Sequence, residues 1–276
     1  MSGIILVAVI ALICGILLSV ASVVFAVPVD ETQVKIRAVL PGANCGACGF
    51  SGCDGYAAAL AAGTAEPGLC SPGGQEVAQQ CAEILGKTAG EMVKKVALVN
   101  CFGTCENAGT KMNYVGVNTC QAASLMFAGD STCAYGCLGK GDCAAACPEK
   151  AIIVHDGMAM IDQDRCVGCG ICVKTCPKHI ISLIPYGQKT HVLCSNTDKG
   201  PDAVKVCKVS CIGCMKCQKT CQHDAIHVVN FNAVIDYDKC VDCGECAAVC
   251  PRNAITKTAV KAEAQAPKAP EAPAAE

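Results

Sequence analysis

The cysteines of this chain constrain its fold more than any other feature, because most of them recur at spacings of two and three residues. There are 27 of them in 276 residues, and all but Cys14 lie between Cys45 and Cys250. Two runs share one form: Cys166-x2-Cys169-x2-Cys172-x3-Cys176-Pro177 and Cys240-x2-Cys243-x2-Cys246-x3-Cys250-Pro251. In a bacterial run of this kind, three thiolates hold one [4Fe–4S] cluster and the fourth binds a second cluster. The two runs therefore predict an electron-carrying protein.

Composition is consistent with metal centres as a source of stability. Aromatic residues make up 4% of the chain and Trp is absent, so a large aromatic core is excluded. Small cores generally need cross-links from disulfides or metal centres. The net charge of -2 argues against a nucleic-acid partner, which a basic face would attract.

Disulfides and structural zinc are the alternatives to iron–sulfur clusters. Exported proteins are often rich in disulfides, but three sulfurs on one tight loop pair poorly with one another. Zinc also binds Cys-x2-Cys pairs, but triple runs that end in Cys-Pro are not zinc-ribbon spacing. The spacing favours iron–sulfur. A non-redox scaffold holding structural metal is a further hypothesis, and it would lack the brown colour of the clusters.

Residues 4–27 carry no charged side chain, and as a helix they would span about 36 Å, enough to cross a bilayer. A signal peptide would have a basic region first, and none is present, although Val24-Phe25-Ala26 resembles a cleavage site. A buried core helix is rarely so long and uniform. We expect residues 1–29 to be a retained, single-pass anchor, in which Cys14 is a small apolar residue.

Charge after this segment predicts its orientation. Lys35 and Arg37 follow it and no basic residue precedes it, so the positive-inside rule places the bulk of the chain on the cytoplasmic side of the cell (inner) membrane. A reducing compartment also keeps cluster-binding thiols free.

Residues 30–95 form a separate cysteine module, Cys45-x2-Cys48-x4-Cys53-x16-Cys70. Residue patterns predict helices over 56–62 and 75–87. Cys81 lies in the second of these, and we interpret it as a packing residue rather than a ligand. The module is expected to hold one [4Fe–4S] cluster.

The rest of the chain contains an internal repeat with a period of 74 residues. The segment 161–166 returns as 235–240, and the same shift relates Cys147 to Cys221, Cys143 to Cys217, Cys137 to Cys211, Cys133 to Cys207 and Cys120 to Cys194. Each copy contains a β-rich segment, at 151–155 and 225–229, which predicts an antiparallel hairpin beside cluster-binding loops.

The predicted fold class is therefore α+β, with an N-terminal transmembrane helix, a small [4Fe–4S] module and tandem bacterial ferredoxin-like domains that each hold two [4Fe–4S] clusters. The two ferredoxin-like units are expected over 96–186 and 187–256. Residues 257–276 are rich in Ala and Pro and are expected to be disordered.

Three ligand sets in the repeats follow from complete runs. They are Cys211, Cys214 and Cys217 with Cys250; Cys240, Cys243 and Cys246 with Cys221; and Cys166, Cys169 and Cys172 with Cys147. In the second unit Gln222 stands where Pro usually follows the crossing cysteine. No ligand is lost there.

One run is altered, because Lys140 stands where the period predicts a cysteine. We expect the missing thiol to come from the nearest cysteine, which is Cys133, in a set with Cys137, Cys143 and Cys176. A three-iron cluster or an empty site is the alternative.

Five further cysteines are unassigned by spacing: Cys101, Cys105, Cys120, Cys194 and Cys207. One arrangement would join the first three to Cys194 or to Cys207. We expect five [4Fe–4S] clusters, and the remaining thiols suffice for a sixth. None of the five His residues has the Cys-x-His spacing of a Rieske centre, so we interpret them as ordinary strand and loop residues.

The anchor, the Cys45–Cys70 module and the tandem ferredoxin runs together resemble the B subunit of the Rnf complex, over residues 4–256 and in its long, clostridial form. The module is the most specific part of this resemblance. It implies an electron-transfer subunit of a membrane-bound, ion-translocating ferredoxin:NAD oxidoreductase. In that role it would accept electrons from reduced ferredoxin and relay them toward NAD⁺ reduction, while other subunits translocate Na⁺ or H⁺.

The sequence agrees with a relay that has no catalytic site of its own. It contains no dinucleotide-binding glycine motif, no P-loop and no nucleophile–base pair, so NAD and flavin are expected to bind other subunits. The predicted anchor has no acidic or basic side chain, so it would not be an ion pathway. The alternative is a ferredoxin-type tether subunit of a membrane hydrogenase or formate dehydrogenase system.

Overall fold

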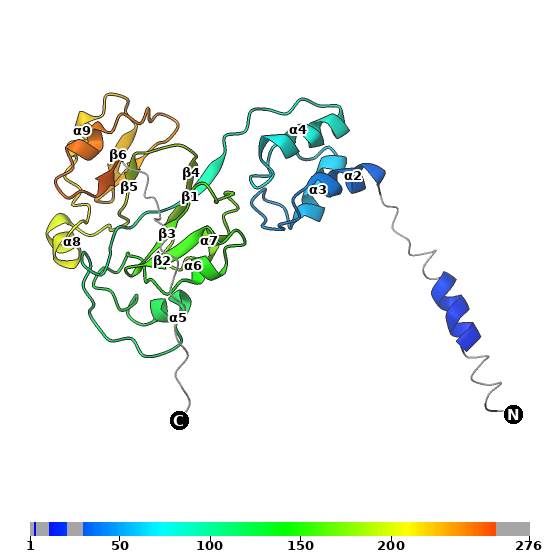
Figure 1. Ribbon diagram of the computed structural model, residues 1–276, viewed down its shortest axis with the longest axis horizontal. Coiled ribbons are helices and arrows are strands. Elements are labelled where there is room, and N and C mark those ends of the chain that lie inside the picture. The colour runs from blue at the N-terminus through cyan, green and yellow to red at the C-terminus, as the bar shows by residue number, and fades with distance from the viewer. Residues whose placement is uncertain (1–2, 4–10, 21–29, 258–276) are drawn as a thin grey trace.

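Two bodies joined by an extended segment make up most of the chain (Figure 1). The computed structural model describes residues 3, 11–20 and 30–257. The helices are α2 (Glu31–Val39), α3 (Cys53–Ala61), α4 (Gly74–Leu85), α5 (Cys120–Leu125), α6 (Asp142–Ala145), α7 (Ile171–Thr175), α8 (Gly200–Val206), α9 (Lys216–Thr220) and α10 (Glu245–Ala248). The strands are β1 (Lys95–Val99), β2 (Ile152–His155), β3 (Met158–Ile161), β4 (Ile181–Pro185), β5 (His191–Val192), β6 (Ile226–Val229), β7 (Asn232–Ile235) and β8 (Ile255–Thr256).

The smaller body consists of α2, α3 and α4, with α2 packed against both other helices. Ile36, Tyr56 and Leu60 are its largest fully buried side chains. Helix α3 is rich in alanine, which lets its neighbours approach closely. The Asp30 carboxylate accepts a hydrogen bond from the Thr32 amide (2.8 Å) and so caps the start of α2.

The predicted helices of this body are present, with one shifted start. Helix α3 begins at Cys53 rather than at Tyr56, because the Asn44 side chain accepts a hydrogen bond from the Cys53 amide (2.8 Å) and organises the first turn. Helix α4 ends before Gly86, which adopts a left-handed conformation that favours glycine. Cys81 is buried in α4, as expected for a packing residue.

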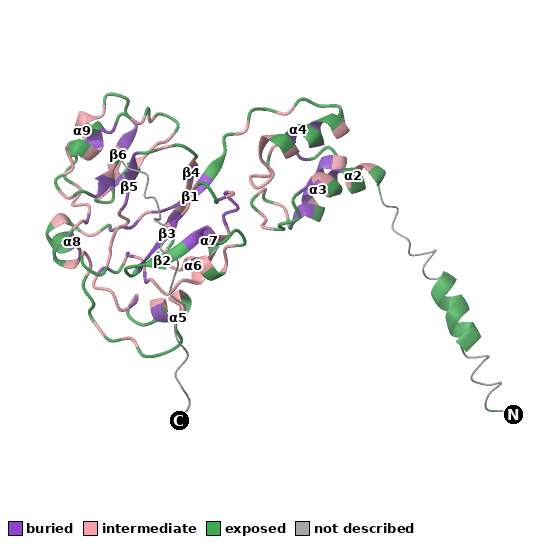
Figure 2. Cartoon of the chain, in the orientation of Figure 1, coloured by how far each residue is buried: buried purple, intermediate pink, exposed green. Residues whose placement is uncertain are grey.

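The larger body contains four two-stranded antiparallel sheets: β2–β3, β6–β7, β1–β4 and β5–β8. Both predicted hairpins are confirmed, with Ile152 opposite Ile161 and Ile226 opposite Ile235. Its largest buried cluster surrounds β1 and β4, where Val96 and Ile184 are almost fully buried (Figure 2). The sheets therefore form small cores beside the cysteine loops.

Hydrogen bonds at the strand ends show how the two units correspond. The Asn100 amide donates to the Ile180 carbonyl (2.7 Å), and the Leu193 amide donates to the Ala254 carbonyl (2.8 Å). Ile180 and Ala254 are one period of 74 residues apart, whereas Asn100 and Leu193 are farther apart. The first unit therefore has extra residues between β1 and Cys133.

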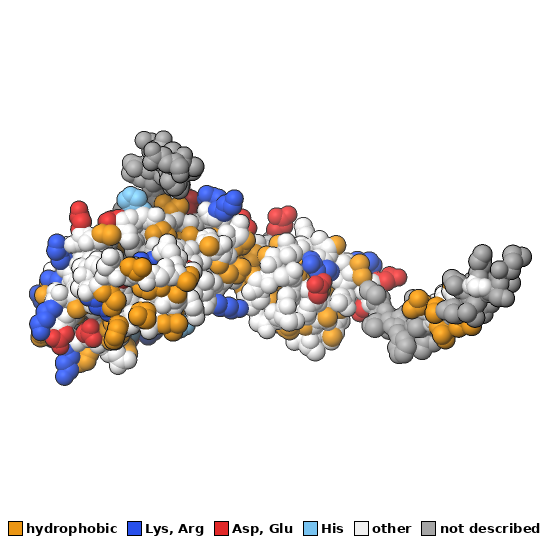
Figure 3. Space-filling model, turned by 90° about the horizontal axis from the view of Figure 1, so that it is seen from below, with side chains coloured by type: hydrophobic (Ala, Val, Ile, Leu, Met, Phe, Trp, Pro, Cys, Tyr) orange, Lys and Arg blue, Asp and Glu red, His pale blue; other side chains and the backbone are white. Residues whose placement is uncertain are grey.

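This insertion contains α5, which lies at the lower end of the larger body in Figure 1. Several of its apolar side chains are exposed, among them Leu125 and Phe127. Apolar side chains also gather on the face of this body seen from below (Figure 3). The insertion thus adds little to the core, and it carries two cysteines, Cys105 and Cys120.

The predicted anchor is described only at residue 3 and over residues 11–20, which form an exposed helix. The rest of the anchor, and the predicted disordered tail 257–276 beyond its first residue, lie outside the described residues. In the described ranges, no helix has both the length and the apolar character that crossing a bilayer requires.

Candidate metal centres

The four predicted ligands of the smaller body, Cys45, Cys48, Cys53 and Cys70, converge between α3 and the loop before α4. Burial and the neighbouring Cys53, Cys45 and Cys48 thiols raise the pKa of Cys70. The Tyr56 hydroxyl donates to the Glu66 carbonyl (2.8 Å) and accepts from the Leu69 amide (3.2 Å), so a buried ring fixes the loop that carries Cys70. All four predicted ligands of this module are brought together.

The complete run of the first ferredoxin-like unit gathers with its predicted crossing cysteine. Burial raises the pKa of Cys172 to about 12, with further contributions from Cys166, Cys169 and Cys147. The Cys147 sulfur accepts a hydrogen bond from the Ala151 amide at 3.4 Å. Such bonds stabilise a thiolate and influence the potential of a bound cluster.

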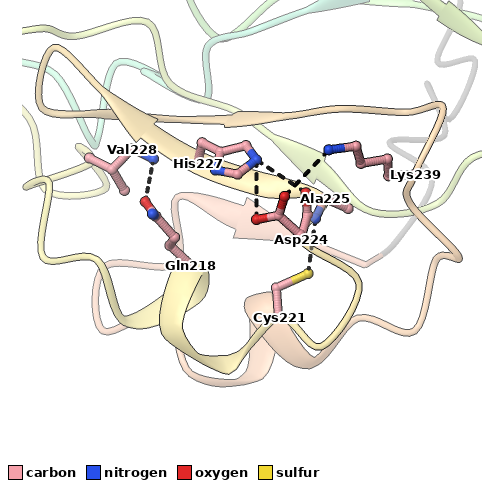
Figure 4. A network of polar contacts seen from close by, with 7 residues as sticks. All are labelled: Gln218, Cys221, Asp224, Ala225, His227, Val228 and Lys239. Atoms are coloured by element: carbon pink, nitrogen blue, oxygen red, sulfur yellow. Dashed lines mark hydrogen bonds and ion pairs between the residues drawn. The ribbon is translucent and has the colours of Figure 1, made fainter.

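The equivalent group in the second unit consists of Cys221, Cys240, Cys243 and Cys246, which line one cavity. Figure 4 shows the Cys221 sulfur beneath the Ala225 amide, which donates to it at 3.4 Å just as in the first unit. The Asp224 carboxylate bridges the Lys239 ammonium (3.3 Å) and the His227 ring (3.6 Å). These contacts hold the turn that presents Cys221.

The other group of the second unit is also assembled as predicted. Burial, with the neighbouring Cys211, Cys214 and Cys250, raises the pKa of Cys217 to about 11. Thiols this weakly acidic are protonated at neutral pH, so cluster binding must displace their protons.

The altered run is completed by Cys120 rather than by Cys133. Cys120, Cys137, Cys143 and Cys176 line one cavity, and burial with these neighbours raises the pKa of Cys143 to about 12. The Asp142 carboxylate accepts hydrogen bonds from the Cys120 amide (2.9 Å) and the Gln121 amide (3.1 Å). Asp142 thus fixes the start of α5 beside the run, a long-range contact that no spacing in the sequence indicates.

Lys140, which occupies the repeat position of Cys214, turns to a different partner. Its ammonium lies 2.9 Å from the Asp130 carboxylate, and both side chains are 20% exposed. The glycine before this position has the same conformation in the two units: Gly139 and Gly213 have φ values of 64° and 63°. The substitution of Lys140 for a cysteine therefore removes a thiol without changing the turn at this glycine.

A sixth group lies between the two units. Cys101, Cys133, Cys194 and Cys207 line a common cavity, together with Cys137, which also lines the cavity of the altered run. Burial raises the pKa of Cys101 to about 12 and that of Cys194 to about 11. We call these four residues the central group.

The central group has an approximate two-fold relation that the sequence period conceals. The Cys101 sulfur accepts from the Cys137 amide (3.4 Å), and the Cys194 sulfur accepts from the Cys211 amide (3.2 Å). Cys137 and Cys211 are one period apart, so Cys101 is the structural equivalent of Cys194. The 74-residue shift pairs Cys194 with Cys120 instead, and the insertion in the first unit is the reason for the difference.

Three cysteines lie outside the six groups. Cys14 is in the exposed helix 11–20, Cys81 is buried in α4, and Cys105 is exposed on a loop beside Asp156. Cys105 is one of the thiols that spacing leaves unassigned, and the structure does not bring it to the central group. None of the 27 cysteines, all within described ranges, is in a disulfide.

The geometry of the groups fits four-iron clusters rather than single ions. Across the described part of the chain, no three His, Cys, Asp or Glu side chains converge closely enough to hold one metal ion. In a [4Fe–4S] cluster each thiolate binds a different iron atom, so its four ligands surround a cavity instead of meeting at one point. Cavities lined by four cysteines meet that requirement.

The six groups adjoin one another in a continuous series. Neighbouring groups are linked by electrostatic or hydrogen-bond contacts between the pairs Cys45 and Cys169, Cys172 and Cys143, Cys137 and Cys101, Cys194 and Cys211, and Cys217 and Cys246. The central group is the only link between the two units in this series of described residues.

Comparison with known families agrees with these positions. Residues 40–72 match an Fe-S cluster family, which covers the module of the smaller body. Residues 159–182, 233–256 and 210–224 match families described as 4Fe-4S binding domains.

Relatives extend the similarity to most of the chain. The B subunit of the Na(+)-translocating ferredoxin:NAD(+) oxidoreductase complex of Acetobacterium woodii is 49% identical, over 89% of this chain and 74% of the relative. The B subunit of an ion-translocating oxidoreductase complex of Methanosarcina acetivorans is 39% identical, over 87% and 92%. The B subunit of the proton-translocating ferredoxin:NAD(+) oxidoreductase complex of Clostridium ljungdahlii is 40% identical, over 90% and 88%.

Proposed function

Since the chain belongs to the family of B subunits of Rnf-type, ion-translocating ferredoxin:NAD(+) oxidoreductase complexes, we propose that it relays electrons through six [4Fe–4S] clusters. It is an iron–sulfur electron-transfer subunit of such an oxidoreductase, with 4Fe-4S binding domains in its larger body. Family membership does not specify the number of clusters, their ligands or the direction of electron transfer, and these are what we propose.

The observation that carries the proposal is the grouping of 24 of the 27 cysteines into six sets of four. Each set surrounds a cavity or shares mutually interacting thiols. The proposed ligands are Cys45, Cys48, Cys53 and Cys70; Cys147, Cys166, Cys169 and Cys172; Cys120, Cys137, Cys143 and Cys176; the central group Cys101, Cys133, Cys194 and Cys207; Cys211, Cys214, Cys217 and Cys250; and Cys221, Cys240, Cys243 and Cys246.

When bound, [4Fe–4S] clusters supply reversible one-electron transfer. The chain's own residues set the conditions for it. Buried strands pack beside several of the cysteines, among them Cys172 and Cys217. Backbone amides donate to the sulfurs of Cys147, Cys221, Cys101 and Cys194. The contiguous order of the groups supports a single path from one body through the other.

We propose further that reduced ferredoxin is the electron donor and that NAD⁺ reduction and ion translocation occur in other subunits. The relatives' names include both Na(+)- and proton-translocating complexes, so either ion is compatible with the family. The uncharged segment 4–27 supports a single membrane anchor, with the two bodies on the cytoplasmic side of the cell membrane.

The test is quantitation of iron and acid-labile sulfide in the anaerobically purified full chain, with EPR of the reduced form. Six clusters require about 24 iron atoms and as many sulfides per chain, four for each site. A content of about 20 would mean that one of the six groups holds no cluster, and zinc in place of iron would reject the redox function altogether.

A further inference from the structure

Two cations approach the central group from equivalent positions in the two units. Lys178 follows Cys176-Pro177, and Arg252 follows Cys250-Pro251 one period later. The Lys178 ammonium donates to the carbonyl oxygens of Ala128 (2.6 Å) and Ala134 (2.7 Å), next to Cys133. The Arg252 guanidinium donates to the Cys207 carbonyl at 3.1 Å. Each cation is thus fixed on the segment that carries one cysteine of the central group.

No carboxylate in the described part of the chain forms an ion pair with either cation, Lys178 or Arg252. The Arg252 Nε atom is buried without a hydrogen-bond partner in the described structure. Lys140 provides the contrast, because Asp130 balances its charge at 2.9 Å.

The anionic neighbours of the two cations are cysteine sulfurs. Lys178 interacts electrostatically with Cys133 and Cys176, and Arg252 with Cys207. Lys178 also lines the cavity of the Cys120 group. The central group therefore has one cation beside Cys133 and the other beside Cys207. Of the flanking groups, one has Lys178 beside Cys176, and the other has Arg252 two residues after Cys250.

We propose that Lys178 and Arg252 raise the reduction potential of the cluster held by the central group, an inference that rests on the six-cluster assignment proposed above. The step concerned is the gain of one electron from a neighbouring cluster, with no bond made or broken. That electron adds a negative charge inside the protein, where a nearby fixed cation stabilises the reduced form. The junction between the two units is thereby a site where an electron is held more tightly than at its neighbours.

The experiment is an EPR-monitored redox titration of the full chain. Cys133→Ala first identifies the central cluster as the signal that disappears with about four iron atoms. Lys178→Gln and Arg252→Gln then remove one charge each while keeping an amide that donates hydrogen bonds. In the double variant we expect the equilibrium constant for reduction of the central cluster to fall at least tenfold, which is about 59 mV for a one-electron couple.

Controls separate charge from structure. Lys178→Arg with Arg252→Lys keeps both charges and should leave the potential near that of the wild type. Lys205→Gln removes an exposed lysine that is paired with Asp202 and should shift no signal. If the double Gln variant loses iron, the two single variants are tested instead. Each single variant should lower the reduction potential of the central cluster and of only one flanking cluster.

Two results would overturn the inference and are distinguishable. An unchanged potential in iron-replete Gln variants rejects the role of the cations and leaves the six clusters standing. Full iron content in Cys133→Ala, with every signal retained, rejects the central cluster and the inference with it.

Discussion

At the scale of single residues, the buried thiols of this chain are expected to lose their protons only when they bind metal. Burial raises the pKa of Cys101, Cys143 and Cys172 to about 12. Without iron these side chains are neutral and tolerate their apolar surroundings. Cluster assembly must release their protons, and the backbone amides that donate to sulfur partly compensate the negative charge that results.

The thiol that Cys120 supplies to the altered run should be replaceable by a thiol at position 140. Cys120→Ala should cost one cluster, about four iron atoms, because it removes a thiol from the cavity of Cys137, Cys143 and Cys176. Adding Lys140→Cys should restore that iron, because Gly139 and Gly213, which precede this position in the two units, have the same conformation. Iron content and EPR of the two variants measure this directly.

The exchange has a structural cost and a matched control. Lys140→Cys leaves the partly buried Asp130 without its partner, so we expect the free energy of unfolding to fall by about 1–3 kcal/mol. Cys105→Ala, in which an exposed thiol outside the six groups is removed, should lose no iron. Failure of the double variant to regain iron would show that the Lys140 position no longer faces the cavity.

At the scale of secondary-structure elements, sequence patterns within short segments correctly predicted the structures that depend on contacts within those segments. The hairpins β2–β3 and β6–β7 and the complete cysteine runs follow from alternation and spacing within short segments. The cysteine that joins the altered run could not be predicted in this way. Cys120 is held beside that run by a hydrogen bond from its amide to Asp142, which is 22 residues away. The central group was equally hidden, since an insertion shifts Cys101 out of register with Cys194.

Helix α3 positions the loop of Cys70 through one buried hydroxyl. Tyr56 is 2% exposed, and Tyr56→Phe leaves both the Leu69 amide and the Glu66 carbonyl without this partner. We expect a loss of about 1–3 kcal/mol in the stability of the smaller body. The module's cluster should also be lost faster to an iron chelator, which a visible-absorbance time course would measure.

Tyr186→Phe is the matched control, because its hydroxyl donates to Asp164 at 2.8 Å from a side chain that is 45% exposed. An exposed hydrogen bond contributes little, since water replaces it. Equal effects of the two substitutions would contradict the role assigned to Tyr56.

At the scale of the whole molecule, the central group makes the two repeats interdependent. Each unit holds two groups of its own, but Cys101 and Cys133 come from the first unit and Cys194 and Cys207 from the second. Backbone bonds join the units beside this group, with the Lys208 amide donating to the Asn107 carbonyl at 2.9 Å. The two units hold four cysteine groups between them, and the contact between the units brings together the central group, which joins the others into one series.

The proposed anchor should be separable from the cluster-binding part. Deletion of residues 1–28 leaves Asp30, which caps α2, and all six cysteine groups intact. We expect this variant to move from the membrane fraction to the soluble fraction with its iron content unchanged, at about 24 atoms per chain. Deletion through residue 39 also removes α2 with the fully buried Ile36, and it should lose the iron of the smaller body. Retention of the shorter deletion in the membrane fraction would reject the anchor, whereas loss of iron from it would show that the first 28 residues support a cluster.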